Sequence, residues 1–263
     1  MAKQILISGF IFFLCPVCTS LYAQNTRISD NNTIGWFSLN NAFKVSPKIS
    51  FSAELYWRRV KLISEGQANM FKGIINYQIH PKLQLRLGYG LIENIAYGEY
   101  PLNSFGKGFT ENRLFEAAIF TDKVSKIDIS HRFMLEQRWQ GKYSSANLDK
   151  QDSHVYGSRF RYMLRCQMPL IHNSIIDHTP YIAAFDELLI GFGKNVNENV
   201  FDQNRLGLVL GYKFNNTFRI EGGYFCQIAQ LAREINGRNV FQHNKGFIIN
   251  MFLNFDLSKK ENS

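Results

Sequence analysis

The stretch FIINMFLNFDL, residues 247–257, alternates between large apolar and polar side chains with a period of two residues. Six apolar residues share one face of it: Phe247, Ile249, Met251, Leu253, Phe255 and Leu257. Asn250, Asn254 and Asp256 share the other face. Because successive side chains of a strand point to opposite faces, this alternation predicts a β-strand with one face in an apolar environment.

The same alternation recurs along the chain from Trp36 onward in segments of about ten residues, and it predicts about eleven strands. The clearest of these segments are residues 49–58, 83–91, 127–139, 159–168, 205–214 and 218–228. Prolines in the body of the chain lie in predicted connections or flank one, as a closed sheet requires. Short connections are expected near 46–48, 80–82, 122–125 and 215–217, and long ones near 60–68, 94–110, 140–155, 191–203 and 231–245.

Composition excludes several classes of protein. The chain has 263 residues, of which 45% are hydrophobic and 19% charged, so it can form a large core and is not disordered. After residue 20, no apolar run reaches the roughly 18 residues that a membrane-spanning helix needs. The net charge is +9, but the basic residues are spread singly along the chain. We therefore expect no nucleic-acid partner.

Residues 1–23 have the pattern of a secretory signal peptide. Lys3 precedes an apolar segment, and Ala23 supplies a small residue at the expected cleavage point. The remaining residues, 24–263, are expected to form a single domain. Two of the four cysteines lie in the predicted signal peptide. Cys166 and Cys226 lie in alternating segments, where free thiols acting as small hydrophobes are favoured, although a disulfide between the two stays open.

The partition of the two faces favours a transmembrane β-barrel over a soluble sandwich. Each hydrophobic face carries aromatic or large aliphatic residues, often near the strand ends, as in a lipid-facing band with aromatic girdles. The predicted fold is all-β, an antiparallel transmembrane barrel of 10–12 strands with short periplasmic turns and long extracellular loops. Single-chain bacterial barrels have even numbers of strands, which favours twelve strands here, with residues 25–34 as the additional one. The strand at 179–190 is the one most open to revision, because Asp186 and Glu187 are adjacent. A secreted or periplasmic β-sandwich is the alternative.

Several short motifs together resemble one family. They are Trp36 with its strand, RFMLEQR at 132–138, RFRYMLR at 159–165, DELL at 186–189, NRLGL at 204–208 and EGGY at 221–224. The chain resembles, over about Trp36 to Leu257, the family called domain of unknown function 2490, which comprises predicted outer-membrane barrels of Gram-negative bacteria. The resemblance implies fold and location, namely the outer membrane after export, and it brings no catalytic residues.

The predicted inward face is rich in arginine and glutamate. Its expected charged residues are Glu54, Arg58, Arg86, Asp128, Arg132, Glu136, Arg138, Arg159, Arg161, Arg165, Glu187, Arg205, Arg219 and Glu221, with Glu116 as a further acidic candidate. The guanidinium group keeps its charge and pairs with carboxylates in confined spaces. We expect a structural network that fills the lumen. The alternative is a narrow, weakly anion-selective diffusion channel, whose partners would be small anionic solutes in addition to membrane lipid.

Catalysis is not expected. Ser153 and His154 follow Asp152, and His131 follows Ser130, but residues adjacent on a strand point apart. No pattern of histidines and cysteines predicts a metal site, and no cofactor is expected. A hydrolase site at the barrel rim is a further alternative, as is partner binding by the long loops. The largest predicted loop contains Tyr97, Tyr100, Phe105 and Phe109, which would either bind a ligand or fold back over the barrel mouth.

Overall fold

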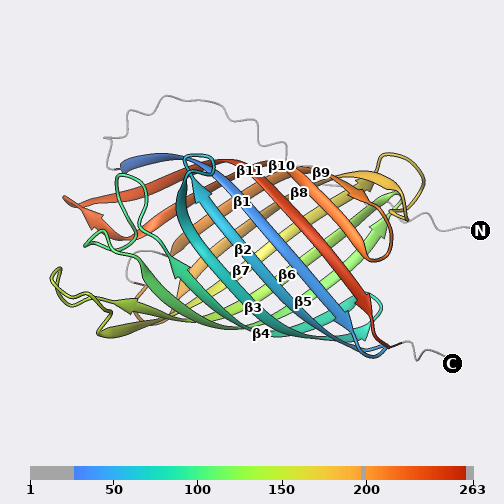
Figure 1. Cartoon of the computed structure of the whole chain (residues 1–263), viewed down its shortest axis with the longest axis horizontal. Coiled ribbons are helices and arrows are strands. Elements are labelled where there is room, and N and C mark those ends of the chain that lie inside the picture. The colour runs from blue at the N-terminus through green and yellow to red at the C-terminus, as the bar shows by residue number, and fades with distance from the viewer. Residues whose placement is uncertain (1–26, 197–199, 259–263) are drawn as a thin grey trace, which may run out of the picture.

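The computed structural model describes residues 27–196 and 200–258, which form one closed β-barrel of eleven strands (Figure 1). The strands are β1 (Arg27–Lys44), β2 (Ile49–Val60), β3 (Glu65–His80), β4 (Leu83–Asn94), β5 (Phe109–Val124), β6 (Ile127–Lys142), β7 (Ser153–Pro169), β8 (Thr179–Phe192), β9 (Phe201–Lys213), β10 (Phe218–Ile235) and β11 (Arg238–Asp256). The predicted signal peptide lies outside the described residues. No helix in the described part of the chain is long and apolar enough to span a membrane.

The barrel closes through a parallel pair, which corrects the expectation of twelve strands in a wholly antiparallel barrel. Neighbouring strands along the chain pair antiparallel, but β1 and β11 run in the same direction, from Arg27 beside Asn239 to Lys44 beside Asp256. When an odd number of strands alternates up and down, the first and last strands must be parallel. Residues 27–34 do not form a separate twelfth strand, because they continue into a single 18-residue strand β1. The strand at 179–190 is present as β8.

The connections define two ends of the barrel. The loop end holds residues 61–64, 95–108, 143–152, 193–196 and 236–237, together with the start of β1. The turn end holds residues 45–48, 81–82, 125–126, 170–178 and 214–217, together with the end of β11. The two termini of the barrel sheet therefore lie at opposite ends, whereas bacterial barrels with an even number of strands bring theirs to one end.

Two predicted long loops are wrong. Residues 231–245 are almost entirely strand, because Asn236 and Gly237 connect β10 to β11 in a tight turn. Both residues have positive φ, 51° and 69°. A two-residue hairpin turn needs this conformation so that its twist matches the right-handed twist of the two flanking strands. The predicted loop at 60–68 shortens to residues 61–64. One connection at the turn end, residues 170–178, is longer than the other connections there.

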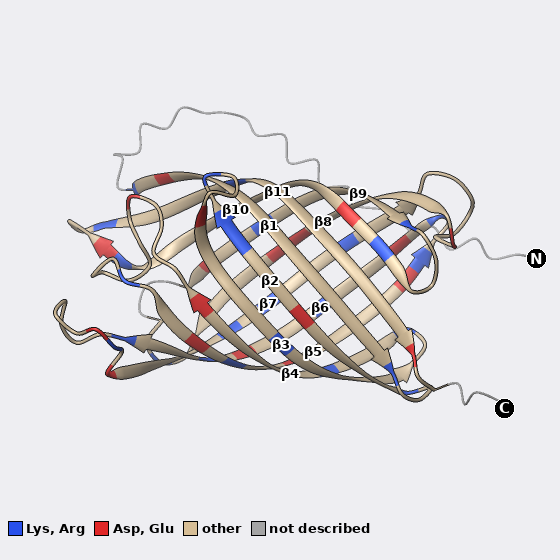
Figure 2. Ribbon diagram, viewed as in Figure 1, with Lys and Arg blue, Asp and Glu red and all other residues tan. Residues whose placement is uncertain are grey.

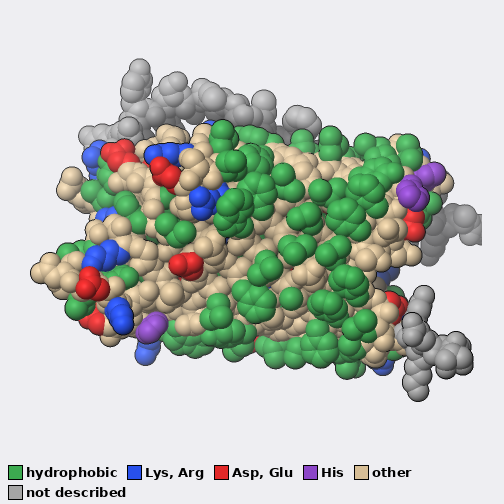
Figure 3. All heavy atoms as spheres, in the orientation of Figure 1, with side chains coloured by type: hydrophobic (Ala, Val, Ile, Leu, Met, Phe, Trp, Pro, Cys, Tyr) green, Lys and Arg blue, Asp and Glu red, His purple; other side chains and the backbone are tan. Residues whose placement is uncertain are grey.

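The outer face of the barrel is apolar. Each of the strands β2 to β11 exposes at least two large apolar side chains, with Leu210 at 62% and Tyr224 at 56% exposed. On β1, Phe37 lies on the outer face, where it contacts the rings of Trp57 and Phe247 at centroid distances of 5.2 and 5.5 Å. In the view of Figure 3 apolar side chains cover the middle of the barrel, and charged side chains gather toward its two ends.

Parts of the inner face are closely packed. Inward-facing glycines accept aromatic rings from the neighbouring strand: Gly88 faces Phe115 and Gly211 faces Tyr181 in register. A Cβ atom at either glycine would lie 2.2 Å from the ring, so glycine is what allows these rings to lie flat against the barrel wall. Further apolar side chains form a cluster beside β1, which includes Trp36 and Phe225 with ring centroids 4.5 Å apart.

Candidate functional site

Ten charged side chains on β5 to β9 form one connected network of ion pairs inside the barrel. Its members are Glu111, Arg113, Arg132, Glu136, Arg138, Arg159, Arg161, Glu187, Asp202 and Arg205. The alternation of each strand places these residues on the inward face, and Figure 2 shows charged positions along the middle of the barrel wall as well as at its ends. Six arginines thus share four carboxylates.

Glu136 is the first centre of this network, and it is almost fully buried at 2% exposure. Its Oε2 accepts hydrogen bonds from Nε and Nη2 of Arg159 at 2.8 and 2.5 Å, and its Oε1 accepts one from Nη1 of Arg161 at 2.5 Å. Arg159 also pairs with Asp202. Charge-assisted bonds of this kind are the strong ones in proteins, and here they join β7 to β6 and to β9 on the inner side of one wall.

Glu187 is the second centre. Its Oε1 accepts hydrogen bonds from Arg132 and Arg161, each at 2.6 Å, and its Oε2 lies 3.2 Å from Nη1 of Arg205. A third carboxylate, Glu111, binds Arg138 through two parallel bonds of 2.6 and 3.2 Å. Three carboxylates therefore hold most of the arginines in fixed positions, as expected for a rigid partition rather than a wide aqueous pore.

Smaller ionic groups lie nearer the turn end. Glu54 accepts a hydrogen bond from Tyr56 at 2.6 Å and lies 3.4 Å from Nζ of Lys72 and 3.9 Å from Arg86. Glu221 accepts hydrogen bonds from Arg165 at 2.6 Å and from the hydroxyl group of Tyr181 at 2.7 Å. At the turn-end mouth, Asp128 lies 3.8 Å from Lys123.

Two of the predicted inward arginines, Arg58 and Arg219, have no carboxylate partner among the described residues. Arg58 lies over the indole ring of Trp36, with 3.7 Å from its Cζ to the ring centroid. Arg219 lies over the ring of Phe252 at 4.2 Å. Both are held by cation–π contacts instead of ion pairs.

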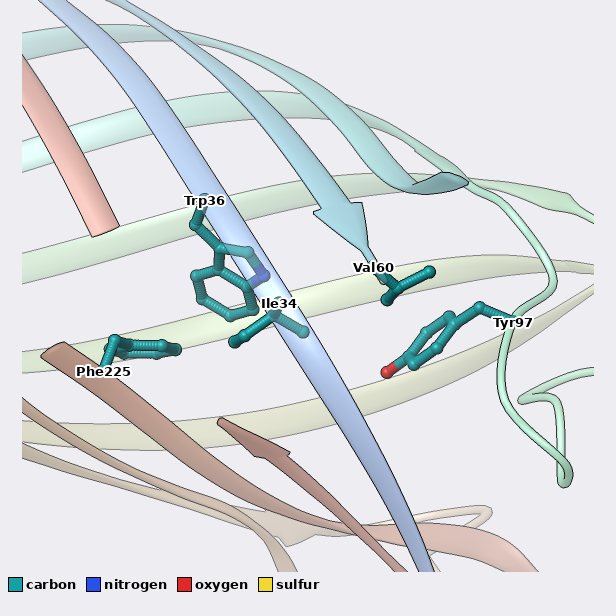
Figure 4. Packing of buried hydrophobic residues seen from close by; sticks show 5 residues of the cluster. All are labelled: Ile34, Trp36, Val60, Tyr97 and Phe225. Atoms are coloured by element: carbon teal, nitrogen blue, oxygen red, sulfur yellow. The ribbon is translucent and has the colours of Figure 1, made fainter. Parts of the chain in front are cut away.

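The loop of residues 95–108 folds over the mouth at the loop end. Tyr97 points into the barrel toward Ile34 and Trp36 (Figure 4), and its hydroxyl oxygen lies 2.8 Å from Oε1 of Gln242 and 3.2 Å from Nδ2 of Asn244. Burial raises the pKa of this hydroxyl group. Of the two arrangements open for the aromatic residues of this loop, the structure shows Tyr97 folded back over the mouth.

Three cavities lie in sequence along the lumen. A loop-end cavity of about 170 Å³ shares Trp36, Arg58, Arg113 and Arg205 with a central cavity of about 140 Å³. The central cavity in turn shares Glu54, Arg86 and Arg132 with a turn-end cavity of about 430 Å³. The three cavities therefore adjoin one another along the lumen, and charged side chains lie where they meet.

The structure places all fourteen predicted lumen residues on the inward face. Seven of them belong to the ten-residue network: Arg132, Glu136, Arg138, Arg159, Arg161, Glu187 and Arg205. The other seven, Glu54, Arg58, Arg86, Asp128, Arg165, Arg219 and Glu221, line the central and turn-end cavities. Glu116, however, is exposed on the outer face and accepts a hydrogen bond from Gln137 at 3.3 Å, so its predicted inward position is wrong.

Sequence reasoning missed Lys72, Glu111, Arg113 and Asp202. On β5 both alternating sets mix charged and apolar residues, so the sequence pattern does not say which set faces inward. Asp202 lies in a segment predicted as loop. The inward position of Lys72 could have been predicted from the alternation of β3, because Lys72 shares a face with Met70 and Ile74.

The residues considered for catalysis do not come together. Asp152 binds the hydroxyl and backbone N–H groups of Ser144, and the hydroxyl hydrogen bond lowers the pKa of the Asp152 carboxyl group. His131 lies on the outer face with its Nδ1 atom 2.9 Å from the hydroxyl group of Tyr162. Across residues 27–196 and 200–258, no group of three His, Cys, Asp or Glu side chains is placed to hold a metal ion. Cys166 and Cys226 are free thiols.

Residues 33–238 match the family described as protein of unknown function (DUF2490). The comparison with curated proteins found no match.

Proposed function

The chain belongs to the DUF2490 family, and from that premise we propose that the protein is an outer-membrane barrel, exported by its signal peptide, whose Arg/Glu network closes the lumen as a non-catalytic structural element. The observation that carries this proposal is the inversion of the usual polarity: the outer face is apolar, and the ionic network is inside. A hydrocarbon environment favours this partition, because it solvates the outer face and requires the closed backbone ladder.

The closed lumen follows from the bonds of the network. Glu136 and Glu187 together bind arginines that project into the lumen from β6, β7 and β9, so the ion pairs fix these long side chains inside the barrel. Tyr97 adds a second barrier at the loop end. A barrel held in this way is expected to conduct few or no ions.

The test combines insertion and conductance. The protein is reconstituted into lipid vesicles, and its migration on gels is compared with and without heating. We expect a faster-migrating, heat-modifiable form that stays with the vesicles through urea extraction, and an electrically silent protein in planar bilayers. A protein that dissolves without lipid or detergent would overturn the membrane assignment.

A narrow anion-selective channel is the second candidate function, and the row of adjoining cavities favours it. Conductance of a variant separates the two. If the protein is a channel, replacing both Arg161 and Arg165 with alanine should change the ion selectivity of conductance steps that the unmodified protein already shows. A structural partition instead loses stability or gains a leak that the parent lacks. Arg59→Ala is the matched control, because this side chain lies at the end of β2 outside the lumen, where it binds the backbone oxygens of Ile63 and Ser64 and lies over the ring of Trp57.

A further inference from the structure

We propose that the lumen is also a binding site for a small hydroxylated oxyanion, whose carboxylate or phosphate group binds Arg58 at the junction of the loop-end and central cavities. This binding goes beyond the proposed structural function, because it requires only the folded barrel and neither conduction nor insertion into a membrane.

Arg58 is the first reason. Its guanidinium group has five N–H donors, yet no hydrogen bond or ion pair joins it to another side chain or backbone oxygen of the described residues. Its Nε atom is buried without a partner. The group borders both cavities, and Trp36 holds it in place from one side. A guanidinium group fixed in this way presents a planar fork that fits an oxyanion with two parallel bonds.

The balance of charge is the second reason. Seven cationic side chains line the central cavity, namely Arg58, Lys72, Arg86, Arg113, Arg132, Arg161 and Arg205. Only two carboxylates line it, those of Glu54 and Glu187. Glu111 and Glu136 lie outside the lining and compensate Arg113 and Arg161, but each also pairs with another arginine. An excess of positive charge at low dielectric is unfavourable, and a bound anion offsets it.

The lining of the loop-end cavity indicates what the rest of the ligand carries. Five glutamines line it, Gln67, Gln140, Gln203, Gln227 and Gln242, together with the rings of Trp36 and Tyr97. Amide groups both donate and accept hydrogen bonds, which matches hydroxyl groups, and the aromatic rings offer apolar faces. We therefore assign the site to an anion the size of an acidic monosaccharide.

Trp36 supplies the readout. The chain has three tryptophans, and Trp57 and Trp139 are exposed on the outer face. In a Trp57→Phe, Trp139→Phe background, emission reports only on the indole ring in contact with Arg58. The protein in detergent micelles is titrated at constant ionic strength with inorganic phosphate, D-glucuronate and D-glucose, with chloride as the balancing anion.

We expect saturable changes in emission with phosphate and with glucuronate, and none with glucose. Arg58→Gln should weaken the binding of both anions at least about tenfold, as expected when a charge-assisted pair is lost. Arg59→Gln, on the next residue of the same strand but outside the lumen, should leave both titrations unchanged.

Three results would overturn the proposal: no saturable response to either anion, an equal response to glucose, or an Arg58→Gln protein that titrates like its parent. Heat-modifiable migration shows whether each variant is folded. If Arg58→Gln does not fold, Arg58→Lys replaces it, because lysine keeps the charge but loses the planar fork. That variant must bind both anions several-fold more weakly. Vesicle insertion is scored separately, so failure of the membrane assignment is distinguishable from failure of the anion site.

Discussion

Replacing Glu136 with glutamine tests whether the charge network holds the barrel together. Glutamine keeps the size of the side chain but removes the charge that faces Arg159 and Arg161. Both partners are buried, with Arg159 at 1% exposure, so their charges would remain in a medium of low dielectric. Removing one partner of a buried ion pair typically costs about 3–5 kcal/mol.

The structure sets the expected value at the lower end of that range. Arg159 keeps its pair with Asp202, and Arg161 keeps its pair with Glu187. We therefore expect a loss of about 3 kcal/mol in the free energy of unfolding. Glu65→Gln is the matched control, because Glu65 pairs with Lys61 while both side chains are more than half exposed. A surface pair of this kind contributes about 0–1 kcal/mol.

Urea unfolding in lipid vesicles, followed by tryptophan emission and by heat-modifiable migration, measures both variants. The expected difference of about 2 kcal/mol corresponds to roughly a thirtyfold change in the unfolding equilibrium. If Glu136→Gln unfolds at the same urea concentration as Glu65→Gln, the buried network does not stabilise the barrel, and the structural reasoning fails.

Three further predictions concern the seam, the loop and the orientation. Gly246→Ala should lower the free energy of unfolding by about 2 kcal/mol or more in the urea assay, because the added Cβ atom would lie 1.8 Å from the backbone oxygen of Ile34 on β1. Gly73→Ala is the control and should be nearly neutral, because no atom lies within 4 Å of the Cβ position there. Equal stabilities would contradict the β1–β11 register. Tyr97→Ala should free its loop, which limited proteolysis detects as faster cleavage there; an unchanged cleavage rate would show that Tyr97 does not anchor it. In intact cells a membrane-impermeant maleimide should label Ser29→Cys at the loop end and not Lys48→Cys at the turn end, and the reverse pattern would invert the proposed orientation.

Sequence periodicity predicted the strands well because each strand has one apolar outer face. The alternation of Leu206, Leu208 and Leu210, for example, corresponds to outward side chains on β9. The preference for twelve strands came from the even strand numbers of bacterial barrels and not from the alternation pattern itself. The pattern indicated about eleven segments, and the pairing of β1 with β11 shows that the sheet closes with that number.

The site was predictable where alternation was unambiguous and unpredictable where it was not. Arg159 and Arg161 lie on a strand whose other face is apolar, so their direction follows from the sequence. Glu116 lies on a strand where both faces are mixed, and the wrong set was chosen. Asp202 shows a further limit, because a carboxylate near a strand end joins the network only through a partner on another strand, here Arg159 on β7.

The seam and the ion network stabilise different parts of the wall. The network occupies β5 to β9, whereas the inward side chains near the middle of β1 and β11 are mostly neutral. There, Ser38 donates a hydrogen bond to Asn250 at 2.7 Å and accepts one from Asn40 at 2.9 Å. The parallel ladder therefore depends on its 18 paired positions and on close backbone approach, not on charge. It follows that loss of Glu136 should weaken the opposite wall while leaving the seam paired, and that the seam should be sensitive to added bulk and insensitive to salt.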